Sequence, residues 1–316
     1  MERDSYERAL HFLKANKPEK RLDIDLSYES FRALEIQAQA KTQSMYPRLG
    51  YCAIDSRVTI HTALTALHSS AAVSLQDYIR DCLRDVLVRH GRQGVLDLLI
   101  PVGDTTYESA DDQGRGTSKS PDNGFKYKIV GRCAELIFVI EVGVSEGYRA
   151  LVADIMLWLN QFHCRTAILL LFKEQQSFRY PRNSDAYSVS DLPAFQAAME
   201  QAESAHPYGP YCFREHAWFG TMDTAIIEVF KRNPTSGTIT TEKKCTLVNG
   251  GHMVIQADRL DLGLSLGDFF PPDEERVADI QTAPIRPRTE SLRLVLASGA
   301  EDTARARFAR FMRRQE

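Results

Sequence analysis

The sequence lacks paired cysteines. Six cysteines are spread over 316 residues, and no two of them form a C-x-x-C pair. Zinc knuckles and small disulfide frameworks both depend on closely spaced cysteines, so the spacing argues against either kind of fold. We expect six reduced thiols, most of them buried.

Long apolar runs are also missing. The chain contains no stretch of eighteen consecutive apolar residues and no basic leader followed by an apolar segment. A membrane-spanning helix needs about 20 apolar residues, and a secretory signal needs such a leader. The expected location is cytoplasmic, with the nucleus as an alternative, and no membrane partner is expected.

The balance of charge provides little long-range attraction for a polyanion. The formal net charge is −3, so contact with a nucleic acid would need a local basic patch. Residues 304–316 have the pattern of a basic amphipathic helix, which predicts contact with RNA or with a partner. A solvated helix that docks a few apolar side chains fits the same pattern. The basic residues of this segment are Arg305, Arg307, Arg310, Arg313 and Arg314.

Hydrophobic periodicity predicts an α/β fold. Apolar residues recur at helical spacing before Gly91, a residue type that can close a helix in the left-handed conformation. Nearly continuous apolar runs then predict strands that are covered on both faces. The expected elements are a helix over 69–90, strands over 95–102, 123–130 and 135–144, a helix from Ser145, and strands over 166–172, 225–231 and 238–248.

Composition divides the chain into three regions. Residues 1–50 are polar, which predicts an N-terminal arm around the core. Residues 51–272 form the expected α/β domain, with an insertion at 175–215. Within that domain, segment 104–120 is rich in Gly, Ser, Thr and Asp and predicts a mobile loop. Residues 273–316 are the expected polar linker and basic C-terminal helix.

Two acidic residues mark the expected strands. Asp122 follows Pro121 directly before one strand, and Glu141 follows four apolar residues in the next. A buried carboxylate is unfavourable unless it meets a cation, a metal or several donors. The pair therefore predicts a polar site, although a helix cap or an ion pair with an arginine would explain either acid alone.

The chain resembles the PD-(D/E)XK nuclease superfamily in the expected helix, the strand after Pro121-Asp122, the strand with Glu141, and the helix and strand that follow. The segments 120–123, Ser-Pro-Asp-Asn, and 141–146, Glu-Val-Gly-Val-Ser-Glu, also resemble a pattern of a large set of fungal proteins. The resemblance to the nuclease superfamily implies a restriction-endonuclease-like core, a mixed central sheet flanked by helices. It also implies that Asp122 and Glu141 hold Mg²⁺ or Mn²⁺ for phosphodiester hydrolysis. The lysine of that family stands two residues after the glutamate, where this chain has Gly143.

The departure at Gly143 leaves two alternatives. Alternate residues share one face of a regular strand, so Lys126 or Lys128 could bring an amine to the side of Asp122, with Glu146 as a further acid. Alternatively, the nuclease site has been reassigned, and its acids bind a guanidinium or ammonium group instead of a metal.

The second alternative matches a resemblance, in overall pattern, to the fungal arginine-containing cyclodipeptide synthases. These enzymes would take an arginyl group and a second aminoacyl group from charged tRNAs and join them into a diketopiperazine. The resemblance implies aminoacyl-tRNA partners, no metal cofactor, and an acidic pocket of Asp122, Glu141 and Glu146. We expect this activity first, a metal-dependent nuclease second, and an inactive nucleic-acid-binding protein third.

Five further residues are candidates for contacting the substrate. Ser145 also suits a helix N-cap, and the two histidines also fit ordinary polar packing. The candidates are Ser145, Tyr148, Asp154, His61 and His68.

Overall fold

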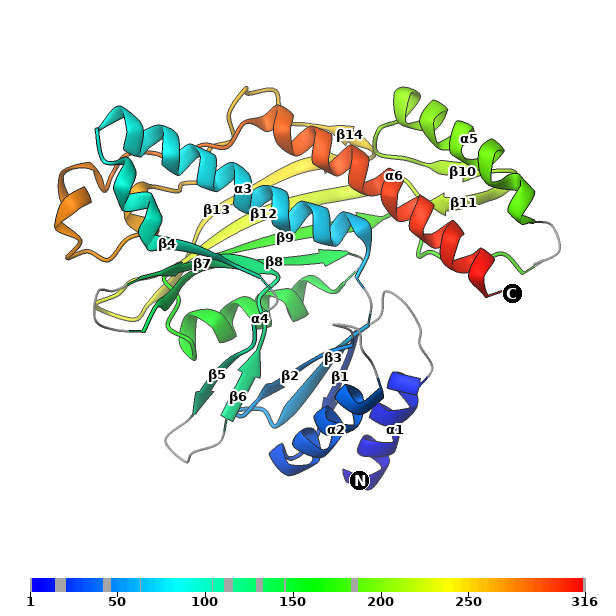
Figure 1. Ribbon diagram of the computed structural model, residues 1–316, viewed down its shortest axis with the longest axis horizontal. Helices are drawn as coiled ribbons and strands as arrows, with labels where there is room; N and C mark the ends of the chain where they lie inside the picture. The colour runs from blue at the N-terminus through cyan, green and yellow to red at the C-terminus, as the bar shows by residue number, and fades with distance from the viewer. Residues whose placement is uncertain are drawn as a thin grey trace.

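The computed structural model of the chain contains a large and a small β-sheet (Figure 1). It describes residues 2–14, 21–41, 47–62, 64–103, 105–110, 116–128, 133–144, 146–182 and 187–314. The expected α/β class, with a mixed sheet flanked by helices, is confirmed. No described helix combines the length and the apolar composition that a bilayer crossing requires. All six cysteines are free, as expected, but only Cys52 and Cys164 are buried.

The large sheet has seven strands among the described residues, in the order β14-β13-β12-β9-β8-β7-β4. Strands β8 and β9 run parallel and are joined by helix α4 (Tyr148–Asn160), whereas the other neighbours are antiparallel. Strand β8 is buried on both faces, because its side chains are apolar on both. The strands are β4 (Leu99–Val102), β7 (Asn123–Tyr127), β8 (Glu135–Val144), β9 (Thr166–Glu174), β12 (Met222–Arg232), β13 (Ile239–Asn249) and β14 (His252–Met253).

Most of the strands expected for this sheet are confirmed. The exception is the segment 95–102, which begins as the 3-10 helix η1 (Gln93–Leu98) and pairs with β7 only from Leu99 onward. Strand β4 is therefore a short edge of the sheet.

Helices cover both faces of the large sheet. Helix α3 (Ala66–Arg89) and helix α6 (Thr289–Arg313) pack together on one face, and α4 covers the other (Figure 1). Helix α3 begins at Thr65, whose hydroxyl accepts the backbone N–H of His68 at 3.0 Å. The chain turns after this helix at Gly91, with φ of 67°, as predicted.

Helix α6 is longer and more buried than the expected basic helix. It begins at Thr289, and its buried side chains include Leu292, Leu296 and Phe308. Small residues let it approach α3 closely: a Cβ at Gly299 would lie 2.8 Å from Leu67 Cδ1. The expected linker before it also contributes to the core, through the 3-10 helix η5 (Glu275–Ile280).

The small sheet replaces the expected N-terminal arm. Two helices, α1 (Glu2–Lys14) and α2 (Tyr28–Lys41), pack against one face of this sheet. The helices and the sheet form a separate hydrophobic core. The expected boundary at residue 50 falls within a strand, and the described part of the expected loop 104–120 forms two more. In sheet order the strands are β1 (Arg21–Asp25), β3 (Arg57–His61), β2 (Arg48–Cys52), β6 (Gly116–Lys119) and β5 (Tyr107–Ala110).

A helix and a hairpin occupy the expected insertion and extend to Phe219. They are α5 (Leu192–Ala205), β10 (Tyr211–Phe213) and β11 (His216–Phe219). Aromatic contacts fix them on α6, since the rings of Phe195 and Phe308 stack at 4.0 Å. This unit lies beside the C-terminal half of α6 (Figure 1).

Candidate functional site

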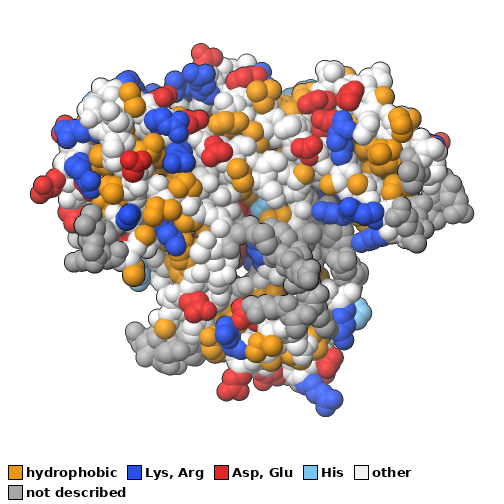
Figure 2. Space-filling model, in the orientation of Figure 1, with side chains coloured by type: hydrophobic (Ala, Val, Ile, Leu, Met, Phe, Trp, Pro, Cys, Tyr) orange, Lys and Arg blue, Asp and Glu red, His pale blue; other side chains and the backbone are white. Residues whose placement is uncertain are grey.

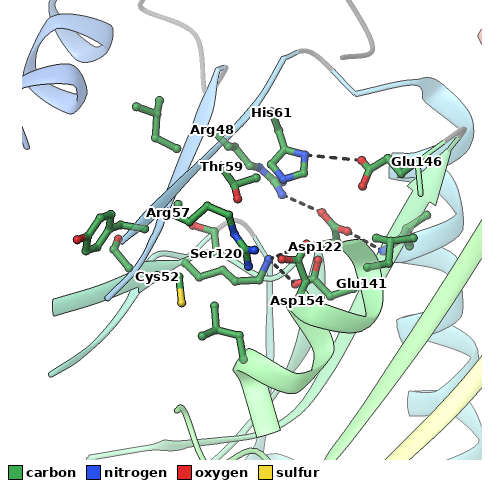
Figure 3. A pocket seen from close by; sticks show the side chains of 18 of the residues that line it. Arg48, Cys52, Arg57, Thr59, His61, Ser120, Asp122, Glu141, Glu146 and Asp154 are labelled. Carbon is green, nitrogen blue, oxygen red and sulfur yellow. Dashed lines mark hydrogen bonds and ion pairs between the residues drawn. The ribbon is translucent and has the colours of Figure 1, made fainter. Parts of the chain in front are cut away.

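The predicted acids meet in a cavity between the two sheets. One wall comes from β2 and β3 of the small sheet, and the other from β8 and α4, with β6 between them (Figure 3). The cavity volume is about 40 Å³, enough for a water molecule or two, since each water occupies about 30 Å³ in the liquid. The predicted residues that line the cavity are Asp122, Glu141, Glu146, Asp154, His61 and His68.

Asp122 is surrounded by donors. Its Oδ1 accepts a hydrogen bond from Arg48 Nη1 at 2.9 Å. Its Oδ2 accepts the backbone N–H of Val142 at 2.8 Å and lies 3.2 Å from His68 Nε2. Burial alone would raise the pKa of this carboxyl, but the charges of His68 and Arg48 and the backbone hydrogen bond hold the pKa well below its ordinary value. Asp122 is therefore ionised at neutral pH.

Glu141 lies on the face of β8 that α4 covers, and its side chain is 7% exposed. It accepts a hydrogen bond from the indole N–H of Trp158. Burial raises the pKa of Glu141 to about 7, and the charges of Asp122 and Asp154 act in the same direction, against the opposing charge of Lys119. A carboxyl that titrates near neutral pH suits general acid–base chemistry.

Lys119 is a site residue that the sequence analysis missed. Its Nζ lies 3.4 Å from Glu141 Oε1 and 3.4 Å from Asp154 Oδ2. Burial lowers the pKa of this amine, but the two carboxylates outweigh burial and raise it above the ordinary value, so the ammonium is charged. The only signal in the sequence was its position three residues before Asp122. That signal is weak, because the segment's composition suggests a loop and gives no strand face to assign.

Gly143, two residues after Glu141 on β8, has no room for a side chain. A Cβ at this position would lie 2.2 Å from Leu151 Cδ1 of α4, and Leu151 is itself buried. Gly143 is therefore packed against α4. Lys119 reaches the same acids from β6.

Arg21 of β1 connects the small sheet to α4. Its Nη1 and Nη2 donate to the carboxylate of Asp154 at 2.6 and 3.3 Å, and Nη1 lies 3.4 Å from Glu146 Oε2. Despite burial, Lys119 and Arg21 lower the pKa of Asp154. Burial raises the pKa of Glu146 to about 7, against the opposing charge of Arg21.

The pKa values of the two histidines of the site shift in opposite directions. Burial opposes a charge on His68, but the contact with Asp122 raises its pKa. His61 lies 3.7 Å from Glu146 Oε1, yet burial and the charge of Arg21 lower its pKa to about 3. At neutral pH, His61 is uncharged.

The prediction that Lys126 or Lys128 reaches the site is wrong. Neither lysine is among the residues that line the cavity. Lys126 instead lies over the ring of Tyr107, with Nζ 4.6 Å from the centroid. Lys128 is exposed after the end of β7.

One candidate for substrate contact, Tyr148, lies apart from the cavity lining. Tyr148 donates to Glu228 Oε2 at 2.8 Å and accepts from Lys244 Nζ at 3.3 Å, so its hydroxyl belongs to a cluster beside β12 and β13. Ser145 lies outside the described residues.

Arg307 cannot contact RNA as predicted. Its side chain is 2% exposed and forms a two-point ion pair with Glu174, at 2.9 and 2.7 Å. The sequence pattern misled here because the Arg307 side chain points into the protein core beneath α6 rather than toward solvent.

The other arginines of α6 differ in exposure. Arg305 contacts Glu301, and Arg310 donates to the backbone carbonyl of Leu64 at 3.4 Å. Arg313 and Arg314 are exposed. A nucleic-acid contact stays a prediction for these last two residues.

The acids match a divalent cation in ligand type. Mg²⁺ is usually held by one or two carboxylates together with substrate phosphates, and Asp122 and Glu141 line the same cavity. Within the described residues, no group of three or more His, Cys, Asp or Glu side chains is placed to hold a metal. A cation at this site would share Asp122 with Arg48 and Glu141 with Lys119.

A scan against protein-family models finds no matching family, and a search of curated proteins finds no matching relative.

Proposed function

We propose that this chain hydrolyses phosphodiester bonds of nucleic acid on a PD-(D/E)XK-like core, with Lys119 in the role of the lysine that Gly143 replaces. The observation that carries the proposal is the contact of Lys119 Nζ with Glu141, 3.4 Å away. If no lysine were near the acids, the cyclodipeptide synthase would be the better explanation of the acidic site. With Lys119, the site has the aspartate, the glutamate and the amine that the nuclease chemistry needs.

The order of elements around the site supports the same proposal. Helix α3 precedes the antiparallel strands β4, β7 and β8, and α4 then leads to β9, which is parallel to β8. The nuclease superfamily that the sequence resembles has its acids on the second and third strands of such a core. Here Asp122 precedes β7 and Glu141 lies on β8.

The side chains of the site have complementary roles in this reaction. Lys119 stays protonated, so it orients the attacking water and stabilises the negative charge that develops on the phosphoryl oxygens. Glu146 lines the same cavity, and its pKa of about 7 suits it to accept the proton of the water. The water oxygen then forms the new bond to phosphorus as the bond to the leaving oxygen breaks.

A divalent metal would be held by Asp122 and Glu141 and would supply Lewis-acid activation of the phosphate and the water. The ionised state of Asp122 suits that role. The cavity is too small for a nucleotide as it stands, so substrate entry requires the small sheet to separate from β8 and α4. The ion pairs of Arg21 and Arg48 span that junction.

Aminoacyl transfer from charged tRNA is the second candidate, and one observation favours it. The acids of the site bind guanidinium groups: Asp154 holds Arg21 at two points, and Asp122 holds Arg48. An arginyl side chain would have to displace Arg21 to use the same carboxylates. Glu141 or Glu146, each with a pKa of about 7, would serve as the base for an attacking α-amine.

A cleavage assay with end-labelled oligonucleotides tests the proposal. We expect cleavage in Mg²⁺ or Mn²⁺ that is lost in Asp122→Asn and in Glu141→Gln. Glu135→Gln is the matched control, because Glu135 is an exposed residue on the same strand as Glu141. Absence of cleavage with either metal would contradict the proposal. A cyclic dipeptide formed from charged tRNAs would then establish the second candidate, and salt-dependent RNA binding alone would indicate an inactive binding protein.

A further inference from the structure

A second cavity lies beside the C-terminal half of α6. Its volume is about 760 Å³, within the range of about 300 to 1,000 Å³ that small-molecule sites occupy. Its walls are the segment 174–179, which leaves β9, and the start of β11. This cavity could accommodate a nucleotide, unlike the smaller cavity between the sheets.

Aromatic rings form part of its wall. Phe178 and His216 line the cavity, with ring centroids 6.0 Å apart. The guanidinium of Arg307 lies 4.2 Å from the Phe178 ring and holds that ring in place. Burial lowers the pKa of His216, so its imidazole is neutral at pH 7. Flat uncharged rings of this kind are the surfaces on which unstacked bases pack.

Polar side chains complete the wall. Gln175, Gln176 and Ser177 line the cavity, and amide and hydroxyl groups can both donate to and accept from the edge of a base. Two acids line it as well. Glu174 is neutralised by Arg307, whereas Glu215 is exposed.

Exposed arginines lie on the rim of the cavity and on the end of α6. Arg179 and Arg182 are exposed on the segment after β9, and Arg313 is exposed in the last turn of the helix. Tyr180 joins the two, because its ring stacks on Phe311 at 5.9 Å. Figure 2 shows lysine and arginine side chains gathered beside the end of α6, at the edge of the notch between the two parts of the molecule.

This surface is close to the proposed active site. Arg307 contacts the wall of the second cavity, and Arg310, one helical turn later, donates to the carbonyl of Leu64, which lines the first. One turn of a helix rises about 5 Å, so a single turn of α6 carries contacts toward both cavities. Both also lie at the C-terminal ends of the parallel strands β8 and β9.

We infer that the second cavity holds an unstacked base of a single-stranded nucleic acid, whose phosphates contact Arg179, Arg182 and Arg313. The inference extends the proposed function, since it names a single strand as the substrate. Its test is separate, because binding is measured without cleavage. Duplex DNA and RNA cannot place a base in the cavity without unpairing it, so they are expected to bind less tightly than single strands.

Fluorescence anisotropy with labelled 12-nucleotide strands, in EDTA so that no metal-dependent cleavage occurs, tests the inference. The decisive variant is Arg179→Gln/Arg313→Gln, and the matched control is Arg84→Gln/Arg89→Gln, two exposed arginines near the distant C-terminal end of α3. Each phosphate contact contributes about 0.7 to the slope of log K against log salt for single strands. We expect the decisive variant to lower that slope by about 1.4 and the control to leave it unchanged.

Phe178→Leu tests the base contact and keeps apolar bulk beside Arg307. We expect roughly tenfold weaker binding of single-stranded RNA or DNA, with the same salt slope, and comparison of the two strands shows which sugar is preferred. Duplexes should be insensitive to this substitution. Equal effects of the decisive and control arginine pairs, or equal affinity of the wild type for duplex and single strand, would overturn the inference whether or not cleavage is found.

Discussion

Two groups of buried charges in this chain differ in how completely their charges are matched. Under α6, Arg307 and Glu174 form a pair in which both side chains are 2% exposed. Glu174 also accepts the backbone N–H of Gly220 at 2.9 Å, and Arg307 donates to the carbonyl of Trp218 at 3.1 Å. One cation pairs with one anion, and each of the two side chains also forms a hydrogen bond with the backbone.

The cavity between the sheets is built differently. Its acids come from β8, α4 and the segments that precede β7 and α4. They share cations that come from the small sheet, and two of those acids have a pKa of about 7. The acids and cations of this cavity do not form one-to-one pairs. The cavity also has room for a water molecule. Under the proposed function, the first group serves stability and the second serves proton transfer. The predictions below test that division.

Breaking the closed pair should have the largest effect on stability. Arg307→Met leaves the Glu174 carboxylate buried without its cation, so the free energy of unfolding should fall by about 3–5 kcal/mol, measured by urea denaturation. The control is Arg84→Met, which removes an exposed ion pair with Asp81 and should change stability by less than about 1 kcal/mol. A similar decrease in the free energy of unfolding for both substitutions would show that the buried pair contributes no more to stability than an exposed pair.

A smaller effect should come from filling the space at Gly143. In Gly143→Ala the new methyl group meets Leu151, so overpacking should lower the free energy of unfolding by about 1–3 kcal/mol. Gly94→Ala is the control, because a Cβ there meets nothing within 4 Å. If Gly143→Ala is as stable as Gly94→Ala, then β8 has room for a side chain and the reason for a lysine on β6 disappears.

The raised pKa values predict how stability depends on pH. Protonated Glu141 and Glu146 are favoured in the folded state, so their contribution is present below pH 4.5, the ordinary pKa, and is lost as pH rises through about 7. Between pH 5 and 8 each carboxyl should lower the free energy of unfolding by about 2–3 kcal/mol. His61, whose pKa is lowered to about 3, should offset about 2 kcal/mol of the total over the same range. Glu141→Gln should reduce the net fall, and Glu135→Gln should not. An unchanged slope in Glu141→Gln would show that Glu141 does not titrate in this range.

Sequence patterns predicted the parts of the fold that depend on local periodicity. The apolar runs of β8 and β9 and the helical spacing of α3 identify those elements, because each is buried by the same side chains that define its pattern. The acids Asp122 and Glu141 were predicted as a pair for the same reason. Asp122 directly precedes β7 and Glu141 lies on β8, and the apolar pattern locates both strands.

The remainder depends on contacts between distant segments. Strand β6 is polar and short, so only its pairing with β2 and β5 makes it a strand and brings Lys119 to the acids. Arg21 lies 133 residues from Asp154, and no local pattern connects them. The local pattern places Arg307 on a basic helix face, whereas the packing of α6 pairs it with Glu174 of β9.

Lys119 is the residue on which the proposed chemistry depends, and Lys126 is its matched control, since it was the lysine expected from the sequence and lies outside the cavity lining. The most direct measurement is therefore the single-turnover rate of metal-dependent oligonucleotide cleavage by the wild type, Lys119→Met and Lys126→Met, with folding checked by thermal denaturation. We expect Lys119→Met to be slower by about 10²–10³-fold and Lys126→Met to match the wild type. Equal rates for a folded Lys119→Met and the wild type would contradict the account.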